Sequence, residues 1–289
     1  MQQANASDNL LVLGTAQDGG YPHTGCSEDC CREAWKDSNQ KRLIASLAVL
    51  DGKDCFLVDI TPDFKYQLQL IENHINEKPR ISGICITHAH LGHYMGLLEL
   101  GLEVMNTNDI PVYVMPKMKS FLENNAPFTQ LLELNNIRLL ALQDNYPIDI
   151  FKDVKITPFQ VPHRNEYSET VGYRIQSSHH SVIYIPDIDS WDRWDTDINE
   201  LIKKSDIALL DGTFYDKTEL KNRDVSAIPH PSIRESIKYF SALDKMDRKK
   251  VNFIHLNHTN NVLREGSEAR KDVIQQGFQI AYDGMVISI

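Results

Sequence analysis

The chain has 289 residues, of which 42% are hydrophobic and 24% are charged, and this composition excludes a mini-protein or a largely disordered chain. At roughly 100 to 200 residues per domain, the length allows one large α/β domain or two small ones. Its 30 Lys and Arg against 40 Asp and Glu give a formal net charge of -10, which argues against nucleic acid and anionic membranes as partners. The sequence has no apolar run of about 18 residues and no basic leader, so we expect a cytoplasmic protein.

Short apolar or β-branched runs predict strands, in chain order, at residues 10–13, 44–50, 56–58, 81–86, 112–115, 137–142, 154–161, 171–175, 182–185, 207–210 and 251–254. Helical spacing predicts helices at residues 64–77, 97–104, 198–204, 231–240 and 268–276. Strands that alternate with helices, together with a run of strands between about 137 and 185, predict an α/β sandwich with mixed sheets. No repeat or linker interrupts the chain, so we expect a flexible N-terminus at 1–9 and a single domain at 10–289.

Several predicted strands run directly into a histidine or an aspartate. These residues are His88, His163, Asp187, Asp211 and His255. In open α/β sheets, ligands bind at the carboxyl ends of strands, where loops bring side chains into one crevice. We therefore expect these five side chains to belong to one site.

Three imidazoles occur within six residues, at His88, His90 and His93, directly after an apolar strand. Neutral imidazole is a common ligand of transition metals, and two imidazoles at positions i and i+2 can converge on one ion. This spacing predicts a metal site.

The segment 88–93, His-Ala-His-Leu-Gly-His, resembles the HxHxDH signature of the metallo-β-lactamase superfamily. Asp59, His163, Asp187 and His255 fall, in order, where that superfamily has its other motifs. Within the superfamily, the segments 13–22, 211–213 and 254–260 are most similar to the pyrroloquinoline quinone biosynthesis protein B family. The resemblance implies an αββα sandwich of two mixed sheets flanked by helices, with metal ions at one edge.

In the two-metal form that the resemblance implies, His88, His90 and His163 hold the first ion. The second ion takes the signature aspartate, His93 and His255, with Asp187 bridging. Here Gly92 replaces the signature aspartate, so we expect a weakened second site.

Three outcomes follow from this replacement. The protein holds one ion at the first site, it keeps a second ion through His93, Asp187 and His255, or His258 compensates as an additional ligand. The cofactor we expect is Zn²⁺, as one or two ions, with Fe²⁺ and Mn²⁺ as alternatives.

A divalent ion with an open position lowers the pKa of its bound water from 15.7 to about 7, which gives hydroxide at neutral pH. Hydrolysis of a small ester, lactone, amide or phosphodiester is the leading hypothesis. We expect Asp187 to orient or deprotonate the water, and His230 to give a proton to the leaving group. Asp59 is the candidate that orients an imidazole, and Asp211 is either a supporting base or a turn residue.

The five cysteines include two, Cys55 and Cys85, in apolar runs where buried thiols are expected. Cys26, Cys30 and Cys31 form a separate cluster, which resembles the position where related proteins hold a structural zinc with a CxCxxC run, but the spacing here is C-x₃-C-C. A closed zinc site needs four ligands, so His23 or His230 would have to complete it; free or redox-active thiols are the alternative.

Two further hypotheses stand beside hydrolysis. One is an oxidative enzyme related to quinone cofactor biosynthesis, with iron held by His93, His255 and Asp187. The other is a metal-binding or sensing protein without catalysis. We expect a small-molecule substrate, no nucleic acid and no membrane partner, and the sequence leaves a homodimer open.

Overall fold

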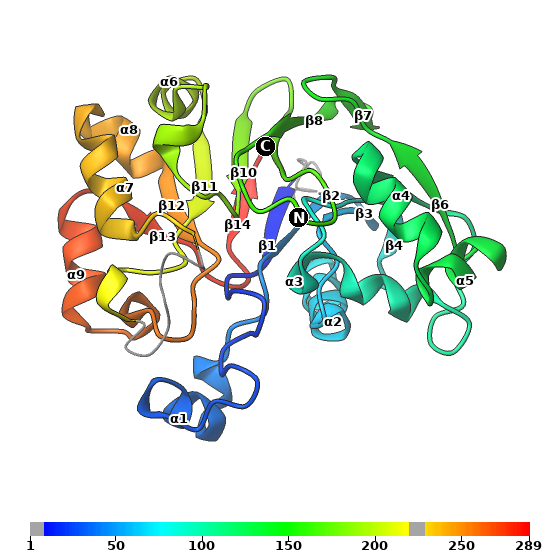
Figure 1. Ribbon diagram of the computed structural model, residues 1–289, viewed down its shortest axis with the longest axis horizontal. Coiled ribbons are helices and arrows are strands. Elements are labelled where there is room, and N and C mark those ends of the chain that lie inside the picture. Colours follow the sequence, from blue (N-terminus) through cyan, green and yellow to red (C-terminus); the bar gives the residue numbers. More distant parts are fainter. Residues whose placement is uncertain (1–8, 220–228) are drawn as a thin grey trace, which may run out of the picture.

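The computed structural model describes residues 9–219 and 229–289, in which two mixed β-sheets pack face to face with helices on both outer sides (Figure 1). The αββα sandwich expected from the sequence is confirmed. The proposed division at residue 9 stays a prediction, and residues 1–8 of that segment lie outside the described part.

The first sheet has the order β14-β1-β2-β3-β4-β5-β6. Its strands are β14 (Val286–Ser288), β1 (Asn9–Gly14), β2 (Ser46–Asp51), β3 (Asp54–Val58), β4 (Arg80–Cys85), β5 (Ile110–Val114) and β6 (Ile137–Ala141). β3 to β6 pair in parallel, whereas β14, β1 and β2 are antiparallel to their neighbours.

The second sheet has the order β13-β12-β11-β10-β9-β8-β7. Its strands are β13 (Gln279–Ile280), β12 (Val251–Ile254), β11 (Ile207–Asp211), β10 (Ser181–Ile185), β9 (Val171–Gln176), β8 (Val154–Gln160) and β7 (Ile148–Phe151). β10 to β13 are parallel, so their carboxyl ends meet at one edge of the sheet.

Helices cover the outer faces of both sheets (Figure 1). The first sheet is covered by α2 (Phe64–Ile75), α3 (Leu91–Tyr94), the 3₁₀ helix η2 (Met95–Leu100), α4 (Pro116–Asn124) and α5 (Phe128–Glu133). The second is covered by α6 (Ile198–Lys203), α7 (Ile233–Tyr239), α8 (Lys245–Lys250) and α9 (Glu268–Gln275). α1 (Asp29–Lys36) lies below the sheets in Figure 1.

Successive side chains of a strand point to opposite faces of its sheet, and this alternation builds the layers. In β1, Leu10 and Val12 face the apolar layer between the sheets, whereas Leu11 and Leu13 pack under the helices of the first sheet. Because both faces of each sheet are covered, the central strands are nearly continuous apolar runs, which is why the sequence shows them clearly.

All the strands expected from the sequence are present, and the buried thiols of Cys55 and Cys85 are confirmed at 0% exposure. The helix expected at 97–104 is wrong, because η2 ends at Leu100. The buried side chains of Leu97 and Leu100 are three residues apart, which suits the 3₁₀ period. Within residues 9–219 and 229–289, no helix has the length and apolar character needed to span a bilayer.

Candidate metal centre

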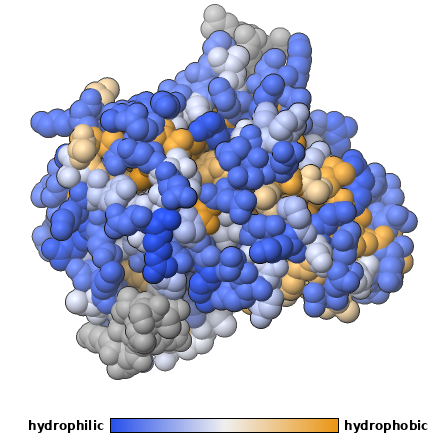
Figure 2. Space-filling model, turned by 45° about the horizontal axis from the view of Figure 1, so that its top comes forward, coloured by the Kyte–Doolittle hydropathy of each residue, from blue (hydrophilic) through white to orange (hydrophobic). Residues whose placement is uncertain are grey.

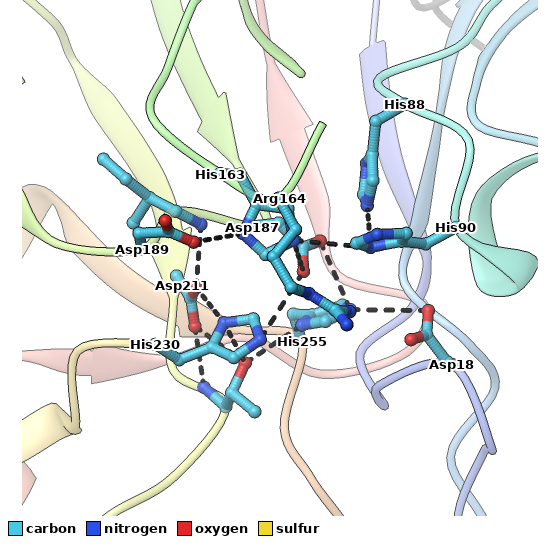
Figure 3. A network of polar contacts seen from close by, with 12 residues as sticks. Asp18, His88, His90, His163, Arg164, Asp187, Asp189, Asp211, His230 and His255 are labelled. Carbon is cyan, nitrogen blue, oxygen red and sulfur yellow. Dashed lines mark hydrogen bonds and ion pairs between the residues drawn. The ribbon is translucent and has the colours of Figure 1, made fainter. Parts of the chain in front are cut away.

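The strand ends meet at one edge between the two sheets, where imidazoles and carboxylates point toward one another (Figure 3). All five strand-end residues expected from the sequence lie there. They are His88 after β4, His163 after β8, Asp187 after β10, Asp211 at the end of β11 and His255 after β12.

A first group of ligand atoms consists of three imidazole nitrogens. His90 Nδ1 lies 2.8 Å from His88 Nε2 and 3.3 Å from His163 Nε2. A tetrahedral zinc ion with bonds of about 2.0–2.1 Å requires nitrogen ligands about 3.3–3.4 Å apart. Burial holds the pKa of both His88 and His90 below the usual value, which favours the neutral imidazole that a metal needs.

A second group lies beside it and contains a residue that the sequence did not indicate, Asp18. Nε2 of His93 lies 3.5 Å from Asp18 Oδ1 and 3.2 Å from Asp187 Oδ2, and Nε2 of His255 lies 4.0 and 3.4 Å from the same two oxygens. All four atoms are buried, and none makes a hydrogen bond within the described part of the chain. Four orphaned buried polar atoms that converge in this way fit a bound cation.

Asp187 stands between the two groups. Its Oδ2 faces His93 and His255, and its Oδ1 lies 3.7 Å from Nε2 of His163. Burial opposes its ionisation, but the imidazoles around it, with His255 and His88 first, hold the pKa of this carboxyl well below its usual value. This carboxylate can therefore touch ions at both positions.

Hydrogen bonds on the far side of each ring fix the imidazoles. Asp59 Oδ2 lies 2.8 Å from His93 Nδ1, and Asp189 Oδ1 lies 3.0 Å from His163 Nδ1. The ring of His90 meets Glu166 at 3.4 Å, a contact between Nε2 and a carboxylate oxygen. Such partners set the tautomer and present the other nitrogen to the metal.

Two of these residues have an uncommon backbone conformation. Asp59 has φ 65° and His255 has φ 62°, which places both in the left-handed region. The buried carboxylate of Asp59 accepts a 2.8 Å hydrogen bond from the backbone N–H of Thr87, and this ties the end of β3 to the segment that carries the histidines. For a histidine this conformation costs free energy, and strained residues of this kind cluster at active sites and ligand clamps.

His230 lies on the other side of Asp187. Its Nδ1 is 2.7 Å from Asp211 Oδ2, and its Nε2 is 4.0 Å from Asp187 Oδ1. Burial lowers the pKa of His230, but the charge and hydrogen bond of Asp211, together with the charges of Asp187 and Asp18, outweigh burial and raise it to about 9. Asp211 is itself fixed by the backbone N–H groups of Ile188 and Thr213. A ring held in this way presents one nitrogen to the centre.

The three clustered cysteines meet a histidine from the far end of the chain. Sγ of Cys26 and Sγ of Cys30 are 3.5 Å apart, and Nδ1 of His258 lies 3.4 Å from the sulfurs of both Cys30 and Cys31. Burial raises the pKa of Cys31 to about 12, so a thiolate there needs a cation. Three sulfurs and one nitrogen are the ligand set of a closed structural zinc site.

This arrangement corrects the expectations for three histidines. His258 was expected as an additional ligand at the histidine cluster, but it lies with the cysteines. The ring of His23 lies against the His258 ring, tilted by 32° with 4.3 Å between centroids, without joining the set, and His230 lies beside Asp211. The reason is local: Leu256 is buried in the core and the backbone N–H of Asn257 binds Thr213, so the chain has turned away before it reaches His258.

Two pockets open beside the centre. One, of about 740 Å³, contains His230 and is lined by Trp191, Arg193, Lys217 and Lys238 among others. The other, of about 710 Å³, lies beside Asp18 and is lined by the aromatic side chains of Tyr21, Trp35 and Tyr66 among others. The face drawn in Figure 2 is mainly hydrophilic, with apolar side chains visible in patches between polar ones.

Residues 55–256 match the family model described as β-lactamase superfamily domain. The chain is 26% identical over 306 residues to "Coenzyme PQQ synthesis protein B" of Xanthomonas campestris pv. campestris (strain B100), with 97% of this chain and 99% of the relative covered. Among solved structures, Zn(2+)-bound PqqB from Methylobacterium extorquens has a TM-score of 0.82 at 23% identity, with 97% and 100% covered. A diphosphatase from the PhnP family has a TM-score of 0.66 at 23% identity, with 97% and 96% covered. The resemblance drawn from the sequence is confirmed, and at these identities the solved structures establish the fold.

Proposed function

Since the chain belongs to the family described as β-lactamase superfamily domain, we propose that it is a metal-dependent hydrolase of a small ester, lactone, amide or phosphodiester. The observation that carries this proposal is the convergence of buried, unpaired imidazole nitrogens and carboxylate oxygens beside a third ring, His230, whose Nε2 also faces the centre. Metal ligands with a proton donor next to them are the parts that hydrolysis needs.

The residues present fit divalent ions at two positions. His88, His90 and His163 would hold one ion, and His93, His255 and Asp187 would contribute to the other. When bound, such an ion supplies a water of lowered pKa and polarises the oxygen of the scissile group.

The protein side chains have separate roles in the reaction. Asp187 orients the attacking water, which at its lowered pKa has released a proton to solvent before the new bond from the water oxygen to carbon or phosphorus forms. His230 donates the proton on Nε2 to the leaving oxygen or nitrogen as the old bond breaks, and Asp211 holds the ring in the tautomer and orientation for this transfer.

The pocket beside His230 supports a small substrate, because its volume of about 740 Å³ lies within the range of ligand sites, roughly 300–1,000 Å³. Arg193, Lys217 and Lys238 line it. Asp189, Asp192 and Glu235 line it as well, and Asp189 pairs with Arg193 and Glu235 with Lys217, so the lining is polar and balanced in charge.

The test is a hydrolysis assay of the Zn²⁺- and Mn²⁺-loaded protein with four probes: 4-nitrophenyl acetate, bis(4-nitrophenyl) phosphate, an aryl amide and an acyl lactone. We expect turnover of at least one probe. For His230→Ala we expect a loss of roughly 10²–10⁴-fold in kcat with the aryl amide and the lactone, whose leaving groups need a proton, and a much smaller loss with the two 4-nitrophenyl probes. His74→Ala, on the exposed face of α2, is the control. Fully metal-loaded protein that hydrolyses none of the four bond types would contradict the proposal.

A second candidate is an oxidation that uses Fe²⁺ and O₂. It is favoured by the set of His93, His255 and Asp187, two imidazoles and one carboxylate, and by relatives named for coenzyme PQQ synthesis. Anaerobic loading with Fe²⁺ followed by exposure to O₂ separates the two candidates, because hydrolysis proceeds without O₂.

We also propose that Cys26, Cys30, Cys31 and His258 hold a structural zinc ion that joins α1 to the loop after β12. The support is the closed set of four ligand atoms, with contacts of 3.4 and 3.5 Å.

A further inference from the structure

Gly92 occupies the position at which the signature of the superfamily has an aspartate, and the space above it is filled by another residue. A Cβ atom built on Gly92 would lie 2.2 Å from Asp18 Oδ1 and 2.8 Å from Asp18 Cα. Both separations are far below van der Waals contact. The two positions are therefore mutually exclusive: a side chain at 92 and the observed place of Asp18 cannot coexist.

Asp18 brings its carboxylate to the Nε2 atoms of His93 and His255, which make no hydrogen bond within the described part of the chain. Oδ1 lies 3.5 Å from His93 Nε2 and 4.0 Å from His255 Nε2, and this oxygen is buried although a third of the side chain, 32%, is exposed. The other side of the same two rings is occupied by Asp187 Oδ2. Two imidazoles between two carboxylate oxygens form a set of four ligand atoms.

We propose that Asp18 is the carboxylate ligand of the second metal ion and takes the role that an aspartate at position 92 would have. The ligand comes from the loop between β1 and α1, 74 positions earlier in the chain. This inference rests on the proposed metal centre, and it restores a second site that the glycine alone would have weakened.

The loop that carries Asp18 is held in place by hydrogen bonds to the segment after β12. The backbone N–H of Gln17 donates to Leu256 O at 3.0 Å, and that of Leu256 donates to Thr15 O at 2.8 Å. The side chain of Asn257 also donates to the Gln17 side chain. The segment before Asp18 is thus bound directly to the segment after His255, so the two ligands share one rigid support.

The test is the metal content of Asp18→Asn, a variant that keeps the volume and removes the charge. After dialysis against a weak chelator, we expect element analysis to find one ion fewer per chain than in the wild type. The affinity for that ion should fall by at least about 100-fold, because loss of a residue that only hydrogen-bonds to a ligand already lowers metal affinity by about 10 to 100-fold. Asp37→Asn removes the same charge from the same part of the chain and keeps the N-cap of η1, so it should hold the wild-type complement.

A spectroscopic readout separates loss of a ligand from general damage. Loaded with Mn²⁺, the wild type should give the EPR signal of two coupled ions, and Asp18→Asn that of an isolated ion. Circular dichroism of the metal-free proteins should show the same unfolding temperature for both. Asp18→Asn with the wild-type ion count and a coupled signal would overturn the inference.

A relocation variant tests the equivalence of the two positions. Asp18→Gly combined with Gly92→Asp returns the carboxylate to position 92, once the backbone at residue 18 yields by a few tenths of an ångström, and should regain the second ion that Asp18→Gly loses. A folded double variant with no more metal than Asp18→Gly would remove the claim of equivalence. Absence of hydrolysis in wild-type protein with both ions bound would instead count against the proposed function alone.

Discussion

His230 and Asp211 form a buried pair in which Nδ1 of the ring lies 2.7 Å from Oδ2 of the carboxylate, while the opposite nitrogen faces the metal ligands. In this role the ring protonates the leaving group, and the need for a proton depends on that group. For His230→Ala we expect a fall in kcat of roughly 10²–10⁴-fold with an alkyl leaving group and a much smaller fall with 4-nitrophenolate.

The measurement is kcat over a series of esters whose leaving groups differ in pKa. A merely structural role for His230 would lower all rates by the same factor, and an equal loss across the series would contradict the assignment. Asp211→Asn should also make kcat depend more strongly on the pKa of the leaving group, as His230→Ala does, while its metal content stays that of the wild type.

Asp59 and Asp189 should act on different ions, because Asp59 binds the ring of His93 and Asp189 binds the ring of His163. We expect Asp59→Asn to weaken the second ion and Asp189→Asn to weaken the first, each by about 10 to 100-fold. Competition with a chromogenic chelator measures both affinities. Equal effects of the two variants on both ions would show that the carboxylates do not orient these particular rings.

The cysteine cluster should protect its thiols when zinc is bound. We expect the thiol reagent DTNB to react slowly with the zinc-loaded protein and to modify three more thiols per chain after chelation, while Cys55 and Cys85 stay unreactive because both are fully buried. Cys30→Ser should lose one zinc ion and unfold at a lower temperature, because structural zinc contributes folding free energy. Thiols that react at the same rate with and without chelator would contradict a zinc site.

Asp283 should make stability depend on pH. Burial raises the pKa of this carboxyl to about 6, against the hydrogen bonds that it accepts from Thr15 Oγ1 and the Leu43 backbone. The folded protein then holds a proton that the unfolded chain releases between pH about 4 and 6, so this contribution is complete below pH 4 and is lost as the pH rises through 6.

Relative to Asp283→Asn, whose side chain does not titrate, the wild-type free energy of unfolding should therefore fall by about 3 kcal/mol over this range. Urea unfolding of both proteins at several pH values, with equal metal content, gives the difference. If the free energy of unfolding of the wild type instead rose with pH relative to that of Asp283→Asn, the pKa of Asp283 would be lowered in the folded protein, which contradicts this account.

The sequence was most informative where the chain is regular. Apolar strands that end in His88, His163 or Asp187 could be recognised because both faces of each sheet are buried and the ligands follow directly. The strands β7, β13 and β14 were not predicted, since they are short and lie at or near the sheet edges. The helices α1, α3, α4, α5 and α8 were not predicted either.

Contacts between loops could not be read from the sequence. Asp18 fills the space above Gly92 only because the β1–α1 loop is bound to the loop after β12, and no local pattern records such a pairing. The same holds for His258, whose side chain joins the cysteines more than 200 positions away, and for Asp189, which follows Asp187 by two residues in a loop.

The most direct test of the metal centre is anomalous diffraction at the zinc absorption edge from crystals of the full chain grown with Zn²⁺. We predict one peak among His88, His90 and His163, and a second among Asp18, His93 and His255, with Asp187 between them. A map at saturating zinc with no peak at these imidazoles, or with the Asp18 carboxylate turned away from a filled second site, would contradict the account.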